Sequence, residues 1–374
     1  MLIITVLQFA LIAGVVVYLT VNMLHLVKVV PAAEPVVSPP FVSVCVPARN
    51  EARGIAACLT SLLKQDYPRF EVIAVDDNST DATLAIMRSL AETFPNLKVI
   101  RGAPLPAGWY GKPFALHQAS AAAGGDYLLF TDADPVFRPQ ALTSTVQYMQ
   151  DNGLDVLTLM PGTRLLTFWE KTVQPVIFAF IAGLTRFKKV NSTEYPNAMG
   201  IGAFILIKRG VYDAIGGHGR VRQKIVEDIE LAKCTKRGGY RLVIADGKAI
   251  LSIRMYHSLR EIWTGWRKNM FVALKKSVFW TLYYMMVILG FQVAPYAVLL
   301  ANLWMGSPVP LIALSSFGLM LVLLTGTRLC GELQIPARLA VLFPLGAVVM
   351  AAIMFNSMAQ SLLKGHTEWR GRKV

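Results

Sequence analysis

The apolar positions of the chain fall into two long runs near its ends, with a region of mixed polarity between them. The first run spans residues 2–27, enough to cross the roughly 30 Å hydrocarbon core of a bilayer as a helix. We interpret residues 1–27 as a membrane anchor. A cleaved signal peptide is the alternative: the small residues Ala32 and Ala33 favour it, and the lack of a basic segment before the run opposes it.

The second run predicts a membrane region in residues 278–363. Its apolar stretches are residues 278–303, 310–325 and 339–363, separated by Gly306-Ser307-Pro308 and by residues 328–332. Three full crossings would put the basic residues 364–374 on the opposite side from the central region. Because we expect that tail in the cytoplasm, one stretch is predicted to be re-entrant or interfacial, with the last, which contains Pro344, as the candidate.

The central region, residues 38–270, alternates short β-branched runs with amphipathic stretches. The pattern predicts strands at residues 41–47, 71–75, 97–100 and 127–131, and helices at residues 50–63, 82–94, 113–123 and 139–150. Asn50 is the expected cap of the first helix, and the polar cluster of residues 76–81, with Ser79 or Thr80 as candidates, that of the second. Such alternation predicts an α/β domain with a mostly parallel sheet, whose ligands bind at the carboxyl ends of the strands.

Residues 165–187 do not fit that alternation. The apolar core of this segment is too short to span a bilayer, and it lacks the polar face expected of a soluble helix. We predict an element lying in the membrane interface that brings an apolar ligand toward the sheet. The alternative is a helix buried in the core of the domain.

Composition and charge agree with a membrane-bound protein: 54% of the residues are hydrophobic and only 16% are charged. The net charge of +14 comes largely from basic residues beside the apolar runs, so anionic lipid headgroups explain it better than nucleic acid does. Lys28 directly follows the anchor, which predicts a multi-pass protein of the cell membrane with its central region in the cytoplasm. The four cysteines are scattered, as fits a reducing compartment.

Acidic residues follow two of the predicted strands. Asp132 and Asp134 close the strand at residues 127–131, and their spacing on extended chain directs both carboxylates to one side. Such a pair can hold Mg²⁺ or Mn²⁺ when a diphosphate supplies further oxygens, although a solvated turn is an equal alternative for this motif alone. Asp76 and Asp77 can accept hydrogen bonds from a nucleobase and a ribose, or can serve in capping the next helix.

Four ordered motifs resemble the signature of family 2 glycosyltransferases, which have the GT-A (Rossmann-like) fold. They are Val44-Cys45-Val46-Pro47-Ala48-Arg49-Asn50-Glu51, Val75-Asp76-Asp77-Asn78-Ser79-Thr80-Asp81, Thr131-Asp132-Ala133-Asp134 and Val226-Glu227-Asp228-Ile229-Glu230-Leu231-Ala232. The membrane tail and two shorter motifs are similar to membrane-bound transferases of carotenoid acids and to hopanoid-associated transferases. Those motifs are Gly108-Trp109-Tyr110-Gly111-Lys112-Pro113 and Glu368-Trp369-Arg370-Gly371-Arg372.

The resemblance implies roles for individual residues on the donor side. The nucleoside, expected to be uridine, would be held by Pro47, Ala48, Arg49, Glu51 and Asp77. The metal ion and diphosphate would be bound by Asp132 and Asp134. Lys112 would reach the phosphates, with an ordinary surface lysine as the alternative.

On the acceptor side, Asp228 matches the catalytic base of the family, and Glu227 is its nearest rival. Inverting transfer needs a carboxylate that removes the acceptor proton during a single displacement. Gly202 would give backbone room beside acceptor and donor, and His218 is expected to be a loop hydrogen-bonder. Trp263 and Trp266 would contact the acceptor, with an interfacial aromatic belt as the alternative.

These features predict transfer of a sugar from a nucleotide-sugar, with a divalent metal, to an isoprenoid-like lipid at the membrane. Polyprenyl-phosphate transfer is one alternative. Polysaccharide synthesis is disfavoured because Gly265 precedes Trp266, where polymer-forming relatives carry the Arg of Gln-x-x-Arg-Trp. The alternative outside the enzymes is a membrane scaffold with an inactive domain of the same fold.

Overall fold

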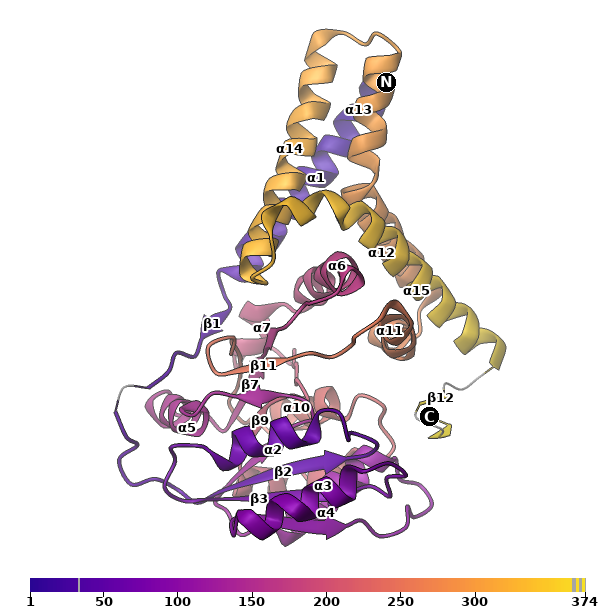
Figure 1. Ribbon diagram of the computed structural model, residues 1–374. Helices are drawn as coiled ribbons and strands as arrows, with labels where there is room; N and C mark the ends of the chain where they lie inside the picture. The colour runs from indigo at the N-terminus through magenta and orange to yellow at the C-terminus, as the bar shows by residue number, and fades with distance from the viewer. Residues whose placement is uncertain (33, 365–367, 370–371, 374) are drawn as a thin grey trace. The chain divides into compact units, whose positions relative to one another are not determined.

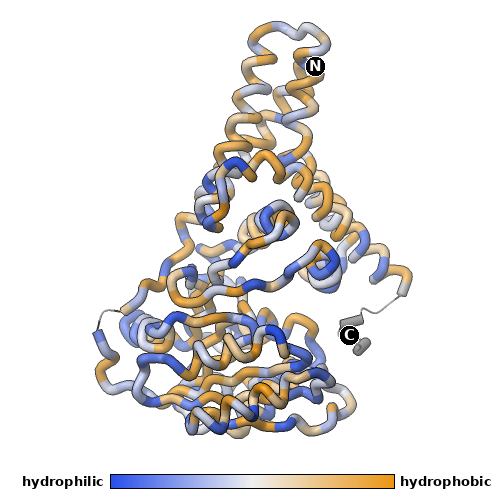
Figure 2. The backbone as a smooth tube through the Cα atoms, in the orientation of Figure 1, coloured by the Kyte–Doolittle hydropathy of each residue, from blue (hydrophilic) through white to orange (hydrophobic). Residues whose placement is uncertain are grey.

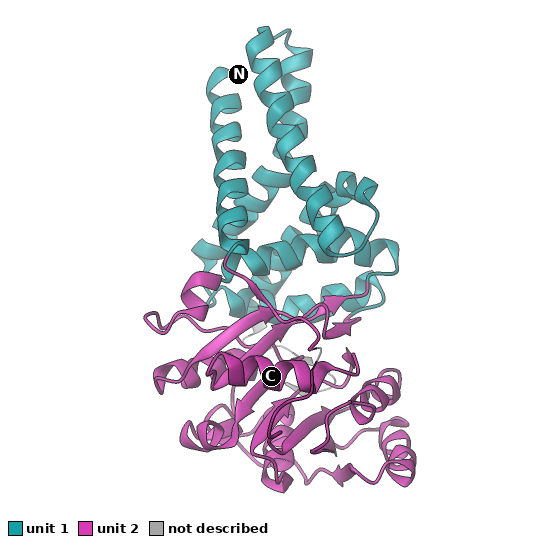
Figure 3. Ribbon diagram, turned by 90° about the vertical axis from the view of Figure 1, so that its left-hand side faces the viewer, with its two compact units in different colours: residues 1–24, 165–185, 256–374 teal, residues 25–164, 186–255 magenta. Residues whose placement is uncertain are grey.

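The computed structural model describes residues 1–32, 34–364, 368–369 and 372–373. The chain forms two compact units (Figure 3). Residues 25–164 and 186–255 make up the first, here called the sheet unit. Residues 1–24, 165–185 and 256–374 make up the second, here called the helical unit. Each unit therefore combines segments that are distant along the chain.

The sheet unit is built on an eight-stranded sheet with the order β1-β10-β7-β9-β5-β2-β3-β4. Its strands are β1 (Val27–Lys28), β2 (Val42–Ala48), β3 (Phe70–Asp76), β4 (Leu97–Arg101), β5 (Tyr127–Phe130), β7 (Val156–Met160), β9 (Ile205–Lys208) and β10 (Leu242–Asp246). All neighbours run parallel except β9, which is antiparallel to both β5 and β7. A smaller sheet joins β6 (Val136–Phe137), β11 (Leu251–Ile253) and β8 (Gly162–Thr163).

Burial explains why these runs form strands. In β2 every residue except Pro47 is buried, as expected for a strand covered on both faces by helices. The connecting helices are α2 (Ile55–Leu63), α3 (Thr83–Thr93), α4 (Gly111–Ala122), α5 (Ala141–Asp151), α7 (Phe187–Asn191), α8 (Arg209–Ala214), α9 (Gly217–Arg220) and α10 (Glu227–Arg237). The prediction of an α/β domain with a mostly parallel sheet is confirmed.

The caps predicted at Asn50 and at Ser79 or Thr80 are wrong, although Asp81 of the predicted capping cluster does bond to the first turn of its helix. Helix α2 begins at Ile55 after the N-cap Gly54, whereas Asn50 lies in the left-handed region with a φ of 54°. Asparagine tolerates that conformation, so the segment after β2 forms a turn before the helix starts. Helix α3 has Ala82 as its N-cap, and it is Asp81 whose carboxylate accepts from the Thr83 N–H at 3.0 Å.

The helical unit contains the apolar helices (Figures 1 and 2). Its elements are α1 (Leu2–Met23), α6 (Phe168–Leu184), α11 (Leu259–Ala273), α12 (Val278–Gln292), α13 (Ala294–Trp304), α14 (Val309–Glu332), the 3₁₀ helix η1 (Ala337–Leu342) and α15 (Phe343–Lys364). Among the described residues, three helices are long and apolar enough to cross a membrane: Leu2–Met23, Val309–Glu332 and Ala337–Leu363.

Polar side chains within the apolar helices join one helix to another. The Gln8 Nε2 donates to the Gly290 carbonyl at 2.5 Å, and the Asn302 Nδ2 donates to the Thr5 Oγ1 at 3.0 Å. Asn22 donates to the Ala182 carbonyl of α6 at 2.9 Å. In a lipid environment the hydrophobic effect does not drive helices to associate, because lipid tails are as apolar as the side chains. Interhelical hydrogen bonds of this kind then help to hold the helices together.

The tail differs from its prediction in two places. Residues 278–303 form two helices, α12 and α13, bent by 52°, and Pro295 in the first turn of α13 supplies no N–H to continue the preceding helix. The predicted break at residues 328–332 is wrong, because α14 continues to Glu332 and contains Arg328. The break at Gly306-Ser307-Pro308 is present.

The first apolar segment ends earlier than predicted, and part of the basic tail lies outside the described residues. Helix α1 ends at Met23, and Val27–Lys28 form the edge strand β1, which pairs with β10. Part of the predicted basic tail, and of the motif at residues 368–372, lies outside the described residues, namely 365–367, 370–371 and 374. The flanking residues Glu368–Trp369 (β12) and Arg372–Lys373 (β13) pair antiparallel.

Candidate active site

The carboxyl ends of β2, β3 and β5 bring the predicted donor-side residues to one edge of the sheet. In the parallel register, Ala48 of β2 lies opposite Asp76 of β3, and Cys45 lies opposite Phe130 of β5. The residues that leave these strands, Arg49, Asp77 and Asp132, therefore emerge at the same edge.

Arg49 and the Asp76–Asp77 turn form a single hydrogen-bonded structure. The Arg49 Nη1 donates to the Asp77 carbonyl at 2.5 Å, and the Asp77 N–H donates to the Ala48 carbonyl at 2.8 Å. The buried Asp76 carboxylate accepts from the Ser79 N–H at 3.3 Å. Asp76 therefore serves the turn, and Asp77, with an exposed fraction of 6%, lies beside it.

Pro47 and Glu51 flank this turn. Pro47 pairs with Val75 within the sheet, and the Glu51 N–H donates to the Thr83 Oγ1 at 2.8 Å. The Glu51 carboxylate lies close enough to Asp134 to raise the pKa of that group. The structure therefore gathers the predicted nucleoside residues near the acidic pair that follows β5.

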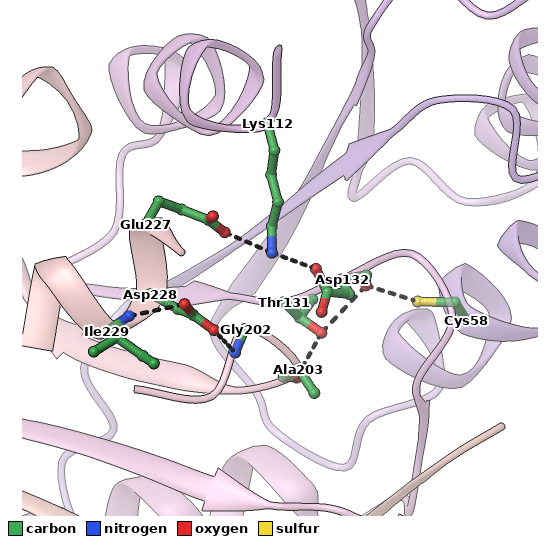
Figure 4. A network of polar contacts seen from close by, with 9 residues as sticks. All are labelled: Cys58, Lys112, Thr131, Asp132, Gly202, Ala203, Glu227, Asp228 and Ile229. Carbon is green, nitrogen blue, oxygen red and sulfur yellow. Dashed lines mark hydrogen bonds and ion pairs between the residues drawn. The ribbon is translucent and has the colours of Figure 1, made fainter. Parts of the chain in front are cut away.

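Lys112 joins two acidic side chains from different parts of the chain (Figure 4). Its Nζ lies 2.6 Å from the Asp132 Oδ1 and 2.6 Å from the Glu227 Oε1. Lys112 belongs to the first turn of α4, Asp132 follows β5, and Glu227 begins α10. Burial alone would lower the pKa of Lys112, but the carboxylates of Asp132, Glu227 and Asp228 raise it well above its ordinary value.

Asp228 is held by backbone donors on both of its carboxylate oxygens. The Gly202 N–H donates to Oδ2 at 2.9 Å, and the Ile229 N–H donates to Oδ1 at 2.8 Å (Figure 4). Burial and the neighbouring Glu227 raise the pKa of Asp228 to about 7, against the opposing effect of Lys112. A fixed carboxylate with a pKa near neutrality has the properties of a general base.

Glycines at residues 200 and 202 allow a close approach of the chain to this cluster. A Cβ at Gly202 would lie 2.8 Å from the Lys112 Nζ and 3.2 Å from the Asp132 Oδ2. The Thr131 Oγ1 donates to the Ala203 carbonyl at 2.8 Å and thereby ties the same loop to β5. Sequence reasoning missed Thr131, although its position just before Asp132 is the signal that could have found it.

Replacing Gly200 with alanine should displace Asp228. The added Cβ would overlap the Asp228 carbonyl, a backbone atom that cannot rotate away as a side chain can. We expect a loss of about 1–3 kcal/mol in the free energy of unfolding, measured by chemical denaturation, together with reduced turnover. Gly210→Ala is the matched control, because a Cβ there meets nothing within 4 Å. Equal behaviour of the two variants would contradict the prediction.

The acidic residues after β5 fit a divalent cation. Burial, followed by the carboxylates of Asp132 and Glu51, raises the pKa of Asp134 to about 8 against a smaller opposing effect of Lys112, so a bound cation would stabilise its ionised form. Within the described residues, no three His, Cys, Asp or Glu side chains form a ready metal site. This suits a hard cation that takes one or two carboxylates from the protein and its other oxygens from a diphosphate.

His218 hydrogen-bonds within the sheet unit, as expected. Its Nδ1 lies 2.9 Å from the hydroxyl oxygen of Tyr212, whose own partner is the Ser120 Oγ at 3.0 Å. Burial, followed by the nearby Lys112 and His117, lowers the pKa of His218 to about 3, so its imidazole is neutral. The ring packs edge-on against Phe130, the last residue of β5, two residues before Asp132.

The two predicted acceptor tryptophans lie in α11 of the helical unit, whereas Gly202 belongs to the sheet unit. The Trp263 Nε1 donates to the Asn356 Oδ1 of α15 at 3.3 Å. Trp266 is buried and meets the rings of Phe178 and Tyr256 edge-on. Both side chains pack between helices of their own unit, and their role toward an acceptor stays a prediction.

Residues 43–216, which hold the edge of the sheet described above, match the family described as Glycosyl transferase family 2. This chain carries a family 2 glycosyltransferase domain. Over 96% of its length it is similar in structure to 98% of a mannosyltransferase from Pyrobaculum calidifontis, described in complex with GDP-Man and Mn²⁺, with a TM-score of 0.53 and 21% identity. That likeness supports the GT-A type of α/β fold.

Relatives of the family 2 glycosyltransferase domain include enzymes that are named for a carotenoid acid. The 4,4'-diaponeurosporenoate glycosyltransferase of Staphylococcus aureus strain MRSA252 is 28% identical over 228 residues, which are 59% of this chain and 59% of that protein. The protein of the same name from strain USA300 is 27% identical over the same shares. The resemblance to carotenoid-related transferases is thus confirmed, and it covers about three fifths of either chain.

Proposed function

We propose that the protein transfers a sugar, with inversion, from a UDP-sugar to the hydroxyl or carboxyl of an isoprenoid-like lipid at the membrane. The observation that carries the proposal is the meeting of Asp132, Glu227 and Asp228 around Lys112 at the carboxyl edge of a family 2 domain. The acceptor would be a carotenoid or hopanoid-like lipid, and the carboxylate in the names of the relatives supports the first.

On the donor side, the nucleoside would lie against the turn of Arg49, Asp76 and Asp77, whose backbone is fixed by the contacts described above. The carboxylates of Asp132 and Asp134 would hold Mg²⁺ or Mn²⁺, which when bound supplies positive charge to the departing diphosphate. Lys112 would give a further positive charge to the same phosphates. The assignment of uridine rests on the resemblance alone, and competition between UDP and GDP tests it.

On the acceptor side, Asp228 would take the proton from the acceptor oxygen. That oxygen forms a bond to the anomeric carbon while the bond from this carbon to the diphosphate oxygen breaks. The electron pair of the broken bond leaves with the nucleoside diphosphate, and the proton stays on Asp228 until water removes it. Attack from the side opposite the leaving group inverts the anomeric centre.

The membrane part of the proposal rests on the helical unit. Helices that are long and apolar enough to cross a bilayer support a multi-pass protein with an anchor in residues 1–27 and further spans in residues 278–363. Lys28 after the anchor favours a cytoplasmic catalytic domain in residues 38–270. We assign α6, which packs against α1, α11 and α15, to the membrane interface near the acceptor.

A direct test offers the purified protein a panel of nucleotide-sugars with a total membrane lipid extract, and follows lipid mass by mass spectrometry. We expect a hexose-sized gain on an isoprenoid-like lipid with one nucleotide-sugar. Gain on a polyprenyl phosphate would support that alternative acceptor instead. No gain, together with no metal-dependent UDP binding by calorimetry, would favour the inactive scaffold.

Transfer should depend on pH through Asp228. Because burial and Glu227 raise its pKa to about 7, while Lys112 opposes them and Asp132 adds to them, acidification protonates Asp228 and removes the base. We expect kcat/KM for a hydroxyl acceptor to fall as the pH drops below about 7. The raised pKa has the opposite consequence for stability. As the pH rises from the ordinary pKa of 3.8 to about 7, the free energy of unfolding should fall, because ionisation of this buried group destabilises the fold. A flat rate profile from pH 5 to 8 would contradict the first expectation.

A further inference from the structure

We propose that Glu227 is the residue that positions the Lys112 ammonium for the donor diphosphate, and not a second base. This inference rests on the proposed function, because it assigns the ligand of Lys112 as a phosphate oxygen. It separates the roles of two adjacent acidic residues that the sequence left as rivals.

The contact itself supports this role. The Glu227 Oε1 lies 2.6 Å from the Lys112 Nζ, and the side chain of Glu227 is only 6% exposed, against 35% for Lys112 and 33% for Asp132. A lysine carries its charge on a flexible four-carbon stem, so its ammonium needs a fixed partner to stay in one place. Glu227, buried at the start of α10, is the more rigid of its two partners.

The same contact argues against Glu227 as the base. A proton taken up by Glu227 would neutralise the carboxylate that pairs with the Lys112 ammonium, and would therefore weaken that ion pair. The oxygens of Asp228 accept hydrogen bonds from the neutral backbone N–H groups of Gly202 and Ile229. Each of those oxygens keeps a second lone pair for a proton from the acceptor.

The ammonium has capacity left for a ligand. It carries three N–H donors, and the two carboxylates at 2.6 Å account for two of them. The third is left for an anionic oxygen. At Gly202 the absence of a side chain keeps this space open, since a Cβ there would lie 2.8 Å from the Nζ.

The backbone joins the two residues a second time. The Tyr110 N–H, two residues before Lys112, donates to the Arg222 carbonyl at 2.8 Å, five residues before Glu227. Gly108, with a φ of 78°, lies beside Gln223 in the same contact. The loop that leads to Lys112 and the loop that leads to Glu227 are therefore held together by a backbone hydrogen bond as well as by the ion pair.

A double-mutant cycle tests the inference through donor KM, kcat and the Kd for UDP in the presence of Mn²⁺. We expect Glu227→Gln to raise donor KM and the UDP Kd about tenfold, with kcat changed less than about threefold, as for loss of one charge-assisted contact. Lys112→Met should do the same or more. Because Glu227 acts through Lys112, adding Glu227→Gln to Lys112→Met should change nothing further.

The chain offers a matched control pair on the same helix. Glu230 and Lys233 form an ion pair whose N–O distance is also 2.6 Å, and within the described residues neither side chain has a hydrogen bond or ion pair to Lys112, Asp132, Glu227 or Asp228. Glu230→Gln, Lys233→Met and their combination should leave donor KM, kcat and the UDP Kd unchanged. Thermal melts of all variants show whether the fold is kept. If the Gln variant misfolds, Glu227→Asp, which keeps the charge but shortens its reach, carries the same expected rise in donor KM.

Two results would overturn the inference. A fall of 10²-fold or more in kcat for Glu227→Gln at unchanged donor KM would make Glu227 a base. Multiplying effects in the double variant would make it independent of Lys112. Failure of the proposed function is distinguishable, because a wild-type protein that transfers no sugar can still be tested for the loss of UDP binding.

Discussion

Asp228→Asn should lower kcat about 10³-fold for a hydroxyl acceptor, within the range expected for loss of a general base. The amide that replaces the carboxylate cannot take up the acceptor proton. Donor binding should persist, because Asp228 contacts the Gly202 and Ile229 N–H groups and its role in the proposal is confined to the acceptor. Single-turnover kinetics with saturating donor, together with the Kd for UDP, measure the two effects separately.

The geometry of Asp228 also predicts a cost in stability. Each of its oxygens accepts a backbone N–H, whereas asparagine offers one oxygen and one NH₂ group, so one backbone donor loses its acceptor. That loss costs about 1–3 kcal/mol of the free energy of unfolding, and it shows most clearly below about pH 7, where the wild-type carboxyl is protonated and its ionisation no longer opposes folding. Asp213→Asn, at an exposed position on α8, is the matched control and should change neither quantity.

A near-silent Asp228→Asn would change the assignment of the acceptor. An acceptor that is already anionic, a carboxylate or a phosphate, needs no proton removed before it attacks. Retained transfer would therefore point to the carboxyl of a carotenoid-type acid or to polyprenyl phosphate. The same variant thus separates a hydroxyl acceptor from both anionic classes.

The later strands β7 and β10 were not predicted, but within residues 41–150 the order of strands and helices was predictable, because each strand there is a short apolar run bounded by polar or turn-forming residues. This was enough to place Asp76, Asp77 and Asp132 at one edge, since parallel strands share their carboxyl ends. The antiparallel strand β9 was not predicted. Its four residues, Ile205–Lys208, follow a glycine-rich loop whose path the pattern does not encode.

The ion-pair partners of Lys112 also could not be predicted from the sequence. The family resemblance implies that its side chain reaches the phosphates, but the ion pairs with Asp132 and Glu227 depend on how β5 and α10 are placed. The bend between α12 and α13 was missed for another reason. Residues on all sides of these helices are apolar, so no change of periodicity marks the break, and Pro295 alone signals it.

Asp132→Ala and Asp134→Ala should each abolish turnover, a fall of at least about 10³-fold, because the donor diphosphate would lose its metal-mediated charge stabilisation. Mn²⁺-dependent binding of UDP should be lost with it, as measured by calorimetry. Chelation of the metal with EDTA should reproduce the effect on the wild-type protein, and added Mn²⁺ should restore activity to the wild type only.

The two variants should differ in their effects on Lys112 and on stability. Removing Asp132 also removes a partner of Lys112 at 2.6 Å, so Asp132→Asn, which keeps the shape, is the better probe of charge alone. Removing Asp134 relieves repulsion among Asp132, Glu51 and Asp134, so Asp134→Ala should be at least as stable as the wild type without metal. Asp151→Ala, at the exposed end of α5, is the neutral control. Full turnover in both alanine variants would remove the cation from the mechanism and leave Lys112 as the positive charge beside the leaving group.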